Sequence, residues 1–262
     1  MRLKRGSLQT LDIVDMAFGG KGIAKIESEK GEYIVFVPNT IPGQKVLARV
    51  AKSKSSYAEC KLVTILEKSP EEIEVPYQSI SGAPYITLPV EKQKKYKKST
   101  AFKLYEKIGK LESTEAIFDE YIESPSAFHY RNKMEYAFST IRHNMVTNEE
   151  EDDAFALGFK HRGTWWKVED LDNDSGMFDE QVENELKNIR NYLYKTGLPA
   201  WHPPKKHGFF RYLVARKSYH SNQILLSLVT SSEGLEQFDA KAFSEYLKSI
   251  FGERLVGFMH TI

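Results

Sequence analysis

Residues 1–67 consist of short apolar stretches separated by turns that are rich in glycine and proline. Gly19-Gly20-Lys21-Gly22 and Pro42-Gly43 mark two of these turns. The stretches expected as strands are 9–14, 23–27, 33–37, 45–51 and 58–66. Short strands at spacings of roughly 8–12 residues are typical of a sandwich or barrel. We therefore expect a small OB-like β-barrel, a fold that leaves one face free for an oligonucleotide.

The remainder of the chain is expected to be α+β. Lys68-Ser69-Pro70 and Val75-Pro76 mark a linker. Residues 90–110 lack helix breakers and predict a Lys-rich helix in which Gly109 is the C′ residue. Beyond residue 125, the patterns predict strands at 130–142, 154–161, 209–217, 223–230 and 254–262, with helices at 177–195 and 240–251, the last one capped by Asp239.

A net charge of +1 conceals strong segregation of charge along the chain. Residues 1–68 hold 12 basic against 7 acidic side chains, and residues 91–110 hold eight lysines against two glutamates. Acidic side chains gather in residues 149–153 and 169–185. Such a chain can hold a polyanion on one face, although each charge block taken alone is also typical of a solvated helix or loop.

The composition excludes several kinds of site. One cysteine, Cys60, is too few for a disulfide framework, a cysteine zinc site or a four-cysteine iron–sulfur cluster within this chain, and we expect it to be a small buried hydrophobe. The seven histidines are scattered, so no metal site is expected. Gly19-Gly20-Lys21-Gly22 lacks the spacing of a Walker loop. With no apolar stretch of membrane-spanning length and no signal peptide, we expect a cytoplasmic protein.

Residues 9–67 resemble a TRAM domain, the RNA-binding barrel of some RNA-modifying enzymes. The resemblance is carried by Asp15, Gly20-Lys21-Gly22-Ile23-Ala24, Ile34-Val35-Phe36-Val37-Pro38 and Ile41-Pro42-Gly43 with Val46. Gln44 replaces an acidic residue that is usual in the family.

The later residues resemble bacterial S-adenosylmethionine-dependent RNA uracil-5-methyltransferases. The matching motifs, in family order, are Leu88-Pro89-Val90-Glu91-Lys92-Gln93, Tyr130-Arg131-Asn132-Lys133-Met134-Glu135-Tyr136, Leu157-Gly158-Phe159, Arg211-Tyr212-Leu213-Val214-Ala215-Arg216 and His260-Thr261-Ile262. Long family members hold an iron–sulfur cluster just before the first motif. Here that stretch, residues 77–84, contains no cysteine, so no cluster is expected.

The resemblance implies a fold class and a domain order. An N-terminal OB-like β-barrel (TRAM, 1–68) is followed by residues 69–124, a linker, degenerate cluster loop and Lys-rich helix, and then by an antiparallel α+β central domain (125–262). The family's cofactor-binding glycine motif and catalytic residues lie beyond His260-Thr261-Ile262. The resemblance therefore implies that the catalytic Rossmann-like domain is absent, that this chain alone is inactive and binds no S-adenosylmethionine, and that helix 90–110 has an exposed apolar side where the family packs its catalytic domain.

RNA contacts are expected from basic side chains in both parts of the chain. The candidates are Lys21, Arg49, Lys52, Lys54, Arg131, Lys133, Lys160, Arg162, Arg211 and Arg216. Phe18 and Tyr57 are candidate stacking rings, whereas Tyr130, Met134, Tyr136 and Phe138 are expected in the core because they alternate along a strand. For each basic residue, a solvated or salt-bridged side chain is the alternative.

Three functions stay open at this point. The first is the RNA-recognition half of a 23S-rRNA-type uracil-5-methyltransferase, which transfers a methyl group from S-adenosylmethionine to C5 of uridine. Ribosomal RNA is preferred because transfer-RNA members of the family generally lack the TRAM domain. The alternatives are a stand-alone RNA-binding protein without catalytic activity and a scaffold that binds no RNA.

Overall fold

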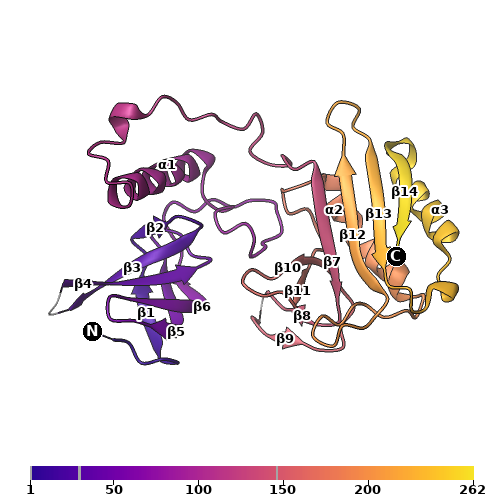
Figure 1. The fold of residues 1–262 in the computed structure, drawn as a ribbon, viewed down its shortest axis with the longest axis horizontal. Coiled ribbons are helices and arrows are strands. Elements are labelled where there is room, and N and C mark those ends of the chain that lie inside the picture. Colours follow the sequence, from indigo (N-terminus) through magenta and orange to yellow (C-terminus); the bar gives the residue numbers. More distant parts are fainter. Residues whose placement is uncertain (1, 29–30, 146) are drawn as a thin grey trace. The chain divides into compact units, whose positions relative to one another are not determined.

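A computed structural model describes residues 2–28, 31–145 and 147–262, which form two compact units. Unit 1 comprises Met1–Pro76 and Ala83–Glu123, and unit 2 comprises Tyr77–Gly82 and Ser124–Ile262. Each unit has its own sheet (Figure 1). The expected domain limits, 1–68, 69–124 and 125–262, stay predictions. Residues 77–82, which were expected in the linker, belong to the second unit.

Unit 1 contains a six-stranded barrel. Its strands are β1 (Leu8–Asp12), β2 (Asp15–Ala17), β3 (Lys21–Ser28), β4 (Gly31–Pro38), β5 (Lys45–Ser53) and β6 (Tyr57–Glu67), in the order β1-β5-β6-β4-β3-β2. The two end strands of this order, β1 and β2, are consecutive in the chain and are separated only by Ile13 and Val14. The bent segment therefore pairs with β5 through one half and with β3 through the other, which closes the sheet on itself.

Alternation along the barrel strands places one side of each strand in a common core. Val35, Val37 and Val46 are fully buried there, together with Cys60 at 2% exposure, as expected. Gly22 lies where β3 passes Thr40, and a Cβ at Gly22 would come within 2.0 Å of the Thr40 Oγ1 atom. Glycine is therefore required at this position by close packing of the barrel.

The rest of unit 1 is helix α1 (Val90–Lys107), followed by a segment with a short 3₁₀ helix, η1 (Glu115–Ile117). The helix ends earlier than expected, and Gly109 is not a left-handed C′ residue, because the positive φ occurs at Lys110. A Cβ at Gly109 would instead lie 2.5 Å from the Tyr105 carbonyl oxygen, so glycine is needed there for close approach. Lys98 lies 4.0 Å from the centre of the Phe118 ring, which ties the following segment to the helix.

Unit 2 is built on one eight-stranded sheet. Its strands are β7 (Lys133–Ser139), β8 (Arg142–His143), β9 (Glu150–Glu151), β10 (Ala156–Lys160), β11 (Val168–Asp170), β12 (Phe210–Lys217), β13 (Ile224–Thr230) and β14 (Leu255–Thr261), in the order β14-β13-β12-β7-β10-β11-β8-β9. The expectation of an antiparallel domain is wrong in two places. β13 pairs with β14, and β11 with β8, in parallel. Helix α3 lies between β13 and β14 in the chain, and strands β9 and β10 lie between β8 and β11.

Two helices, α2 (Glu180–Tyr194) and α3 (Ala240–Phe251), pack on each other, with the Tyr192 and Tyr246 rings stacked at 4.1 Å. They cover one face of the sheet, where alternate residues such as Leu213, Leu226 and Leu228 are fully buried. The residues that alternate with these along the strands, such as Val214 and Ser227, face the other side of the sheet and are only partly buried. We call this less covered side of the sheet the open face. Two short 3₁₀ helices, η2 (Leu235–Gln237) and η3 (Gly252–Arg254), flank α3 in the chain.

The long strand expected at 130–142 is shorter, and the helix expected from residue 177 begins after Asp179. Met134, Tyr136 and Phe138 lie in the core as expected, whereas Tyr130 precedes β7 and is 47% exposed. The prediction that Tyr130 is a core residue is therefore wrong, because strand alternation applies only once the strand has begun.

Candidate nucleic-acid interface

Two of the expected RNA contacts, Lys21 and Lys52, meet on the outside of the barrel. Their ammonium groups lie 3.9 and 3.6 Å from the carboxylate of Glu59 on β6. Lys21 and Lys52 are 43% and 52% exposed, and an exposed ion pair contributes about 0–1 kcal/mol. A phosphate can therefore replace the carboxylate at little cost.

Apolar and aromatic side chains continue the same outer face. Strand register places Ile23, Phe36 and Glu59 in one row across β3, β4 and β6. The Phe36 and Tyr57 rings meet edge to face at 6.0 Å. Phe18, at the turn between β2 and β3, is 70% exposed. The barrel thus presents rings beside lysines, which is the combination that single-stranded nucleic acid binds.

The other two barrel candidates lie apart from this row. Arg49 donates a hydrogen bond to the Gly6 carbonyl at 3.1 Å, on the side where β5 pairs with β1. Lys54 is exposed in the turn after β5, where its backbone amide donates to the Tyr57 carbonyl.

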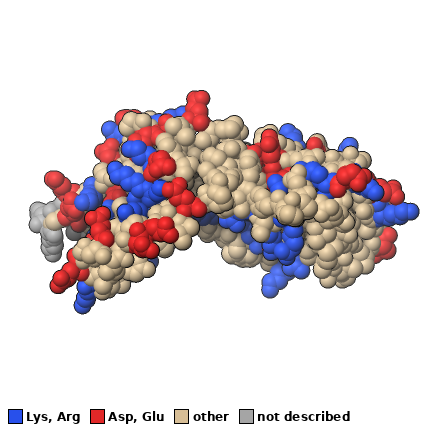
Figure 2. All heavy atoms as spheres, turned by 90° about the horizontal axis from the view of Figure 1, so that it is seen from above, with Lys and Arg blue, Asp and Glu red and all other residues tan. Residues whose placement is uncertain are grey.

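Helix α1 has a basic side that is partly engaged. Lys92 and Lys103 each lie 2.5 Å from a carboxylate, of Glu71 and Asp15 respectively. Its apolar residues near the end are exposed, with Tyr105 at 59% and Ile108 at 76%, as the sequence led us to expect. Over the face shown in Figure 2, basic atoms are interleaved with acidic ones.

The six candidates of unit 2 do not gather in one place. Arg131 precedes β7, with its guanidinium 5.9 Å from the Tyr130 ring, and the Arg162 amide donates to Ser81 Oγ after β10. Lys133 and Arg216 are directly opposite each other on β7 and β12. Lys160 and Arg211 both approach the Tyr212 ring, at 5.2 and 6.0 Å.

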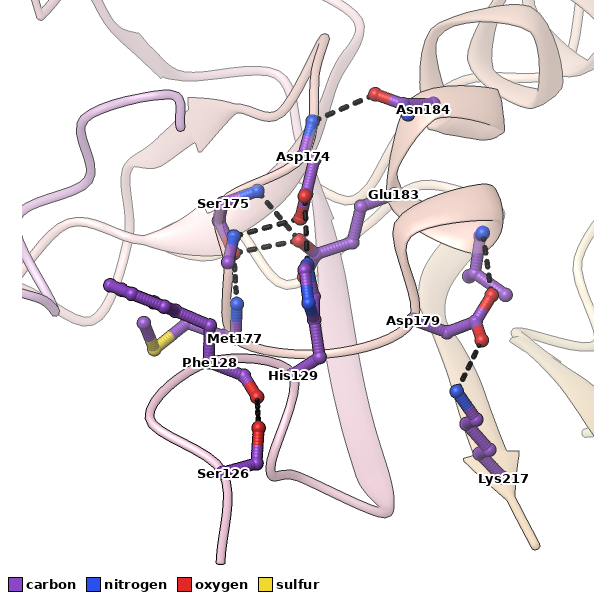
Figure 3. Close-up of polar contacts among 12 residues, drawn as sticks. Ser126, Phe128, His129, Asp174, Ser175, Met177, Asp179, Glu183, Asn184 and Lys217 are labelled. Carbon is purple, nitrogen blue, oxygen red and sulfur yellow. Dashed lines mark hydrogen bonds and ion pairs between the residues drawn. The ribbon is translucent and has the colours of Figure 1, made fainter. Parts of the chain in front are cut away.

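A buried polar cluster holds the segment that leads to Arg131 (Figure 3). Glu183 of α2, which is fully buried, accepts hydrogen bonds from Tyr136 at 3.1 Å and from the Ser175 amide and hydroxyl at 2.7 Å. Asp174 contacts His129 Nε2 at 2.8 Å and accepts from the Gly176 amide. The His129 and Arg131 amides in turn donate to the Gly176 and Met177 carbonyls. Sequence reasoning missed this cluster, because its members come from four separate segments.

The cluster contains a carboxyl with an altered affinity for protons. Burial raises the pKa of Glu183 to about 7, against the hydrogen bonds from Ser175, which lower it. Burial also raises the pKa of Tyr136, and the Glu183 carboxylate adds to this effect. The cluster is therefore a structural support whose proton content changes near neutral pH.

The lone cysteine lies in the core, and the described residues form no metal centre. Burial raises the pKa of the Cys60 thiol to about 11, which suits a core residue. Within the described ranges, no three His, Cys, Asp or Glu side chains are grouped to hold a metal ion. None of the described helices combines the length and the hydropathy that a bilayer crossing requires.

Residues 2–63 match the TRAM domain family, so the chain carries a TRAM domain. Along its length the chain is also similar to RNA methyltransferases. It is 32% identical, over 99% of its residues, to an uncharacterized RNA methyltransferase of Caldanaerobacter subterraneus subsp. tengcongensis, and 31% identical, over all of them, to one of Clostridium tetani. The chain spans 54% of each of these relatives, about half their length.

The fold is shared with a solved enzyme, the Pyrococcus abyssi tRNA (uracil-54, C5)-methyltransferase in complex with S-adenosyl-L-homocysteine. The two superpose over 88% of this chain and 49% of that one, with a TM-score of 0.55 and 20% identity. The expected fold class stated that the catalytic Rossmann-like domain is absent from this chain. The match to a methyltransferase fold contradicts that expectation. The expected inactivity and failure to bind S-adenosylmethionine lose their support with it. The expectation was based on the absence of the family's cofactor-binding glycine motif and catalytic residues. Such motifs indicate a reaction, whereas a fold is determined by how its strands pair.

The Pyrococcus abyssi enzyme binds S-adenosyl-L-homocysteine, the demethylated form of S-adenosylmethionine. In this chain, the strand–helix–strand unit β13–α3–β14 is the place to test the fit of such a cofactor. Ligands of parallel strands lie at their carboxyl ends, here residues 230–239. Thr230 Oγ1 already contacts His260 at 2.9 Å, Ser231 Oγ donates to the Gly208 carbonyl, and Asp239 caps α3. These polar groups are engaged within the protein, so they do not form a cradle fitted to the cofactor.

Proposed function

We propose that this chain recognises RNA in an S-adenosylmethionine-dependent methyltransferase that modifies C5 of uracil, in the cytoplasm. The observation that supports it best is the outer face of the TRAM barrel. Exposed lysines and rings share that face in a chain that is similar to RNA methyltransferases along its length. S-adenosylmethionine supplies the methyl group in such enzymes.

The proposed task of these residues is to offset the cost of exposing a base. C5 of a stacked uracil is out of reach, and extruding the nucleotide costs a few kcal/mol. Lys21 and Lys52 can bind phosphates beside the target, while Phe18 and Tyr57 can stack on unpaired bases. Arg131 and Arg216, which are exposed in unit 2, can add further phosphate contacts.

Ribosomal RNA is the substrate that we propose first. The preference was based on the TRAM domain, and the tRNA enzyme of Pyrococcus abyssi weakens that basis. Its likeness to 88% of this chain must include part of the barrel. Ribosomal and transfer RNA therefore belong in the same experiment.

The experiment uses the full-length natural protein. Unmodified ribosomal and transfer RNA are incubated with methyl-labelled S-adenosylmethionine, and the nucleosides are identified by mass spectrometry. We expect label in 5-methyluridine, and more from ribosomal than from transfer RNA. Label in another nucleoside, or no label, would contradict the proposed reaction.

A barrel variant tests the role of this chain in the same assay. Lys21→Glu/Lys52→Glu/Lys54→Glu should weaken RNA binding and reduce the slope of log affinity against log salt by about 2, since each phosphate contact on a single strand contributes about 0.7. Lys187→Glu/Lys241→Glu/Lys248→Glu, on the helices of unit 2, makes the same change in net charge. Equal losses in both variants would show that only net charge matters.

A further inference from the structure

One part of the open face in unit 2 has features that strand packing alone does not explain. Around Tyr212, side chains from β10, β12 and the segment before β12 form an alternating row of cations and rings. The row runs Lys160, Tyr212, Arg211, Trp201. The Lys160 ammonium lies 3.3 Å from the Tyr212 hydroxyl, and the Arg211 guanidinium lies 4.7 Å from the centre of the Trp201 ring.

A β-bulge produces this arrangement. The register of β12 with β13 shifts between Phe210 and Tyr212, so Arg211 has no direct partner in that ladder. A bulge re-aims the side chain of the extra residue and is common beside functional sites. Here it brings the guanidinium next to the rings of Trp201 and Tyr212 on the open face. Tyr212 also packs on the small buried cluster of Ala137, Ala156 and Val168, which fixes its ring.

The cations of this row have no carboxylate partner among the described residues. Arg142 on β8 and Lys217 at the end of β12 pair with Asp170 and Asp179 at 2.7 and 2.8 Å. Within the described ranges, the contacts of Lys160 and Arg211 are the ring and hydroxyl contacts given above. Cations near one another that lack a carboxylate partner favour an anionic ligand.

Unsatisfied polar atoms gather around Trp201. Arg211 Nε, Thr140 Oγ1 and His202 Nδ1 are buried without a hydrogen-bond partner in the described part of the protein. Thr140 donates its amide proton to the Trp201 carbonyl, and His202 is the next residue in the chain. Buried groups of this kind are rare in native proteins and call for an explanation.

The turn that follows Trp201 adds positive charge. Pro203-Pro204-Lys205-Lys206 connects His202 to His207, which form a bridge, and both lysines are exposed. These lysines, Trp201 and Tyr212 were all missed by sequence reasoning. The Pro-Pro-Lys-Lys turn ahead of the strand expected at 209–217 is the signal that would have found them.

We propose that Trp201, Arg211, Tyr212 and Lys160 form a subsite for one unpaired nucleotide of the bound RNA. The rings of Trp201 and Tyr212 contact the base, while Arg211 and Lys160 bind its flanking phosphates. Stacking on rings and guanidinium planes is how proteins hold unpaired RNA bases. The subsite rests on the proposed RNA recognition and adds to it a second set of contacts, which belongs to unit 2.

The test measures fluorescence anisotropy of a labelled single-stranded octaribonucleotide with the whole protein. Trp201→Leu and Tyr212→Leu should each weaken binding about tenfold without changing the salt slope, because a stacked base contributes without charge. Arg211→Gln should reduce the salt slope by about 0.7. Tyr212→Phe keeps the ring and should bind like the parent protein.

Two controls make the result specific. Tyr246→Leu removes a tyrosine of helix α3 that stacks on Tyr192 of α2, on the other side of the sheet from the open face, and should leave binding unchanged. A fully paired duplex of the same sequence should bind the Tyr212→Leu variant as it binds the parent, since it offers no unpaired base. Circular dichroism of each variant confirms folding.

The outcomes separate the subsite from the function. If the parent binds the octamer and Trp201→Leu and Tyr212→Leu bind it equally well, the subsite is wrong while RNA recognition stands. If the parent binds no RNA, the proposed function fails and the subsite fails with it. A third outcome would identify the row as a protein-docking surface instead. In that case an acidic peptide displaces the octamer from the parent but not from Arg211→Gln, and Tyr212→Leu binds the octamer as well as the parent does.

Discussion

Glu183 shows how one buried residue couples the fold of unit 2 to proton concentration. Its carboxyl is fully buried and is bordered by Tyr136, Ser175 and Asp174. The pKa of Glu183 rises from 4.5 to about 7 because burial disfavours the charged form. The folded state therefore holds a proton between these two pH values, which the unfolded state has lost.

The sign of the effect follows from this difference in bound protons. Stability should fall as pH rises from about 5 to about 7.5, by at most about 1.4 kcal/mol per pH unit, and then level off. Glu183→Gln removes the titration. We expect its free energy of unfolding, relative to the parent protein, to increase from pH 5 to pH 8, as measured by urea unfolding.

His143 affects the pH dependence of stability in the opposite direction, but its effect cancels when Glu183→Gln is compared with the parent protein. Burial lowers the pKa of His143 to about 4, so its contribution to stability increases with pH up to about 6.5. It is present in both proteins and does not affect their difference. A difference in unfolding free energy that stays constant from pH 5 to pH 8 would contradict the role given to Glu183.

At the scale of elements, α2 and α3 both begin at an aspartate but differ in what surrounds it. Asp179 accepts from the Val182 amide and is also 2.8 Å from Lys217 and 2.6 Å from Arg254, at 4% exposure. Hydrogen bonds from these cations lower the pKa of Asp179 to about 2, against the effect of burial. Asp239 accepts from the Ala242 amide and is exposed.

The two aspartates form a matched pair of variants. Asp239→Ala should cost about 1 kcal/mol, the usual value of an N-cap. Asp179→Ala should cost about 3 kcal/mol, because it removes the cap and leaves two partly buried cations without their carboxylate. Urea unfolding at pH 7 measures both. Equal costs would show that Lys217 and Arg254 do not depend on Asp179.

The same elements show what sequence patterns can predict. Strands β3 to β6 were predicted to within two residues and α3 to the residue, because alternation and the Asp239 cap are local signals. β2 was not predicted, and the first strand ends at Asp12 rather than at Val14. The start of α2 was placed too early, since Met177 and Phe178 continue the apolar period ahead of the Asp179 cap. β11 and the parallel pairs were missed, because pairing between distant strands leaves no mark on local sequence.

The candidate site also has a part that local sequence can predict and a part that it cannot. Basic residues such as Lys21 and Arg211 could be selected one by one from charge and motif. Their partners could not be, since Glu59 meets Lys21 and Trp201 meets Arg211 only after the sheets have formed.

At the scale of the whole molecule, each unit has its own core and its own point of close packing. In unit 1, a Cβ at Gly22 would lie 2.0 Å from Thr40 Oγ1, and Thr40 is fully buried. In unit 2, a Cβ at Gly158 would lie 2.0 Å from the Glu169 carbonyl oxygen. The three tryptophans, Trp165, Trp166 and Trp201, all belong to unit 2.

These facts predict two separable unfolding transitions. Gly22→Ala should destabilise the barrel by about 1–3 kcal/mol through overpacking and leave the tryptophan fluorescence transition in place. Gly158→Ala should lower that fluorescence transition, while the barrel transition seen by calorimetry is retained. Domains with separate cores unfold independently unless their interface is large and apolar. A single calorimetric transition, shifted by both substitutions, would show that the two units unfold as one.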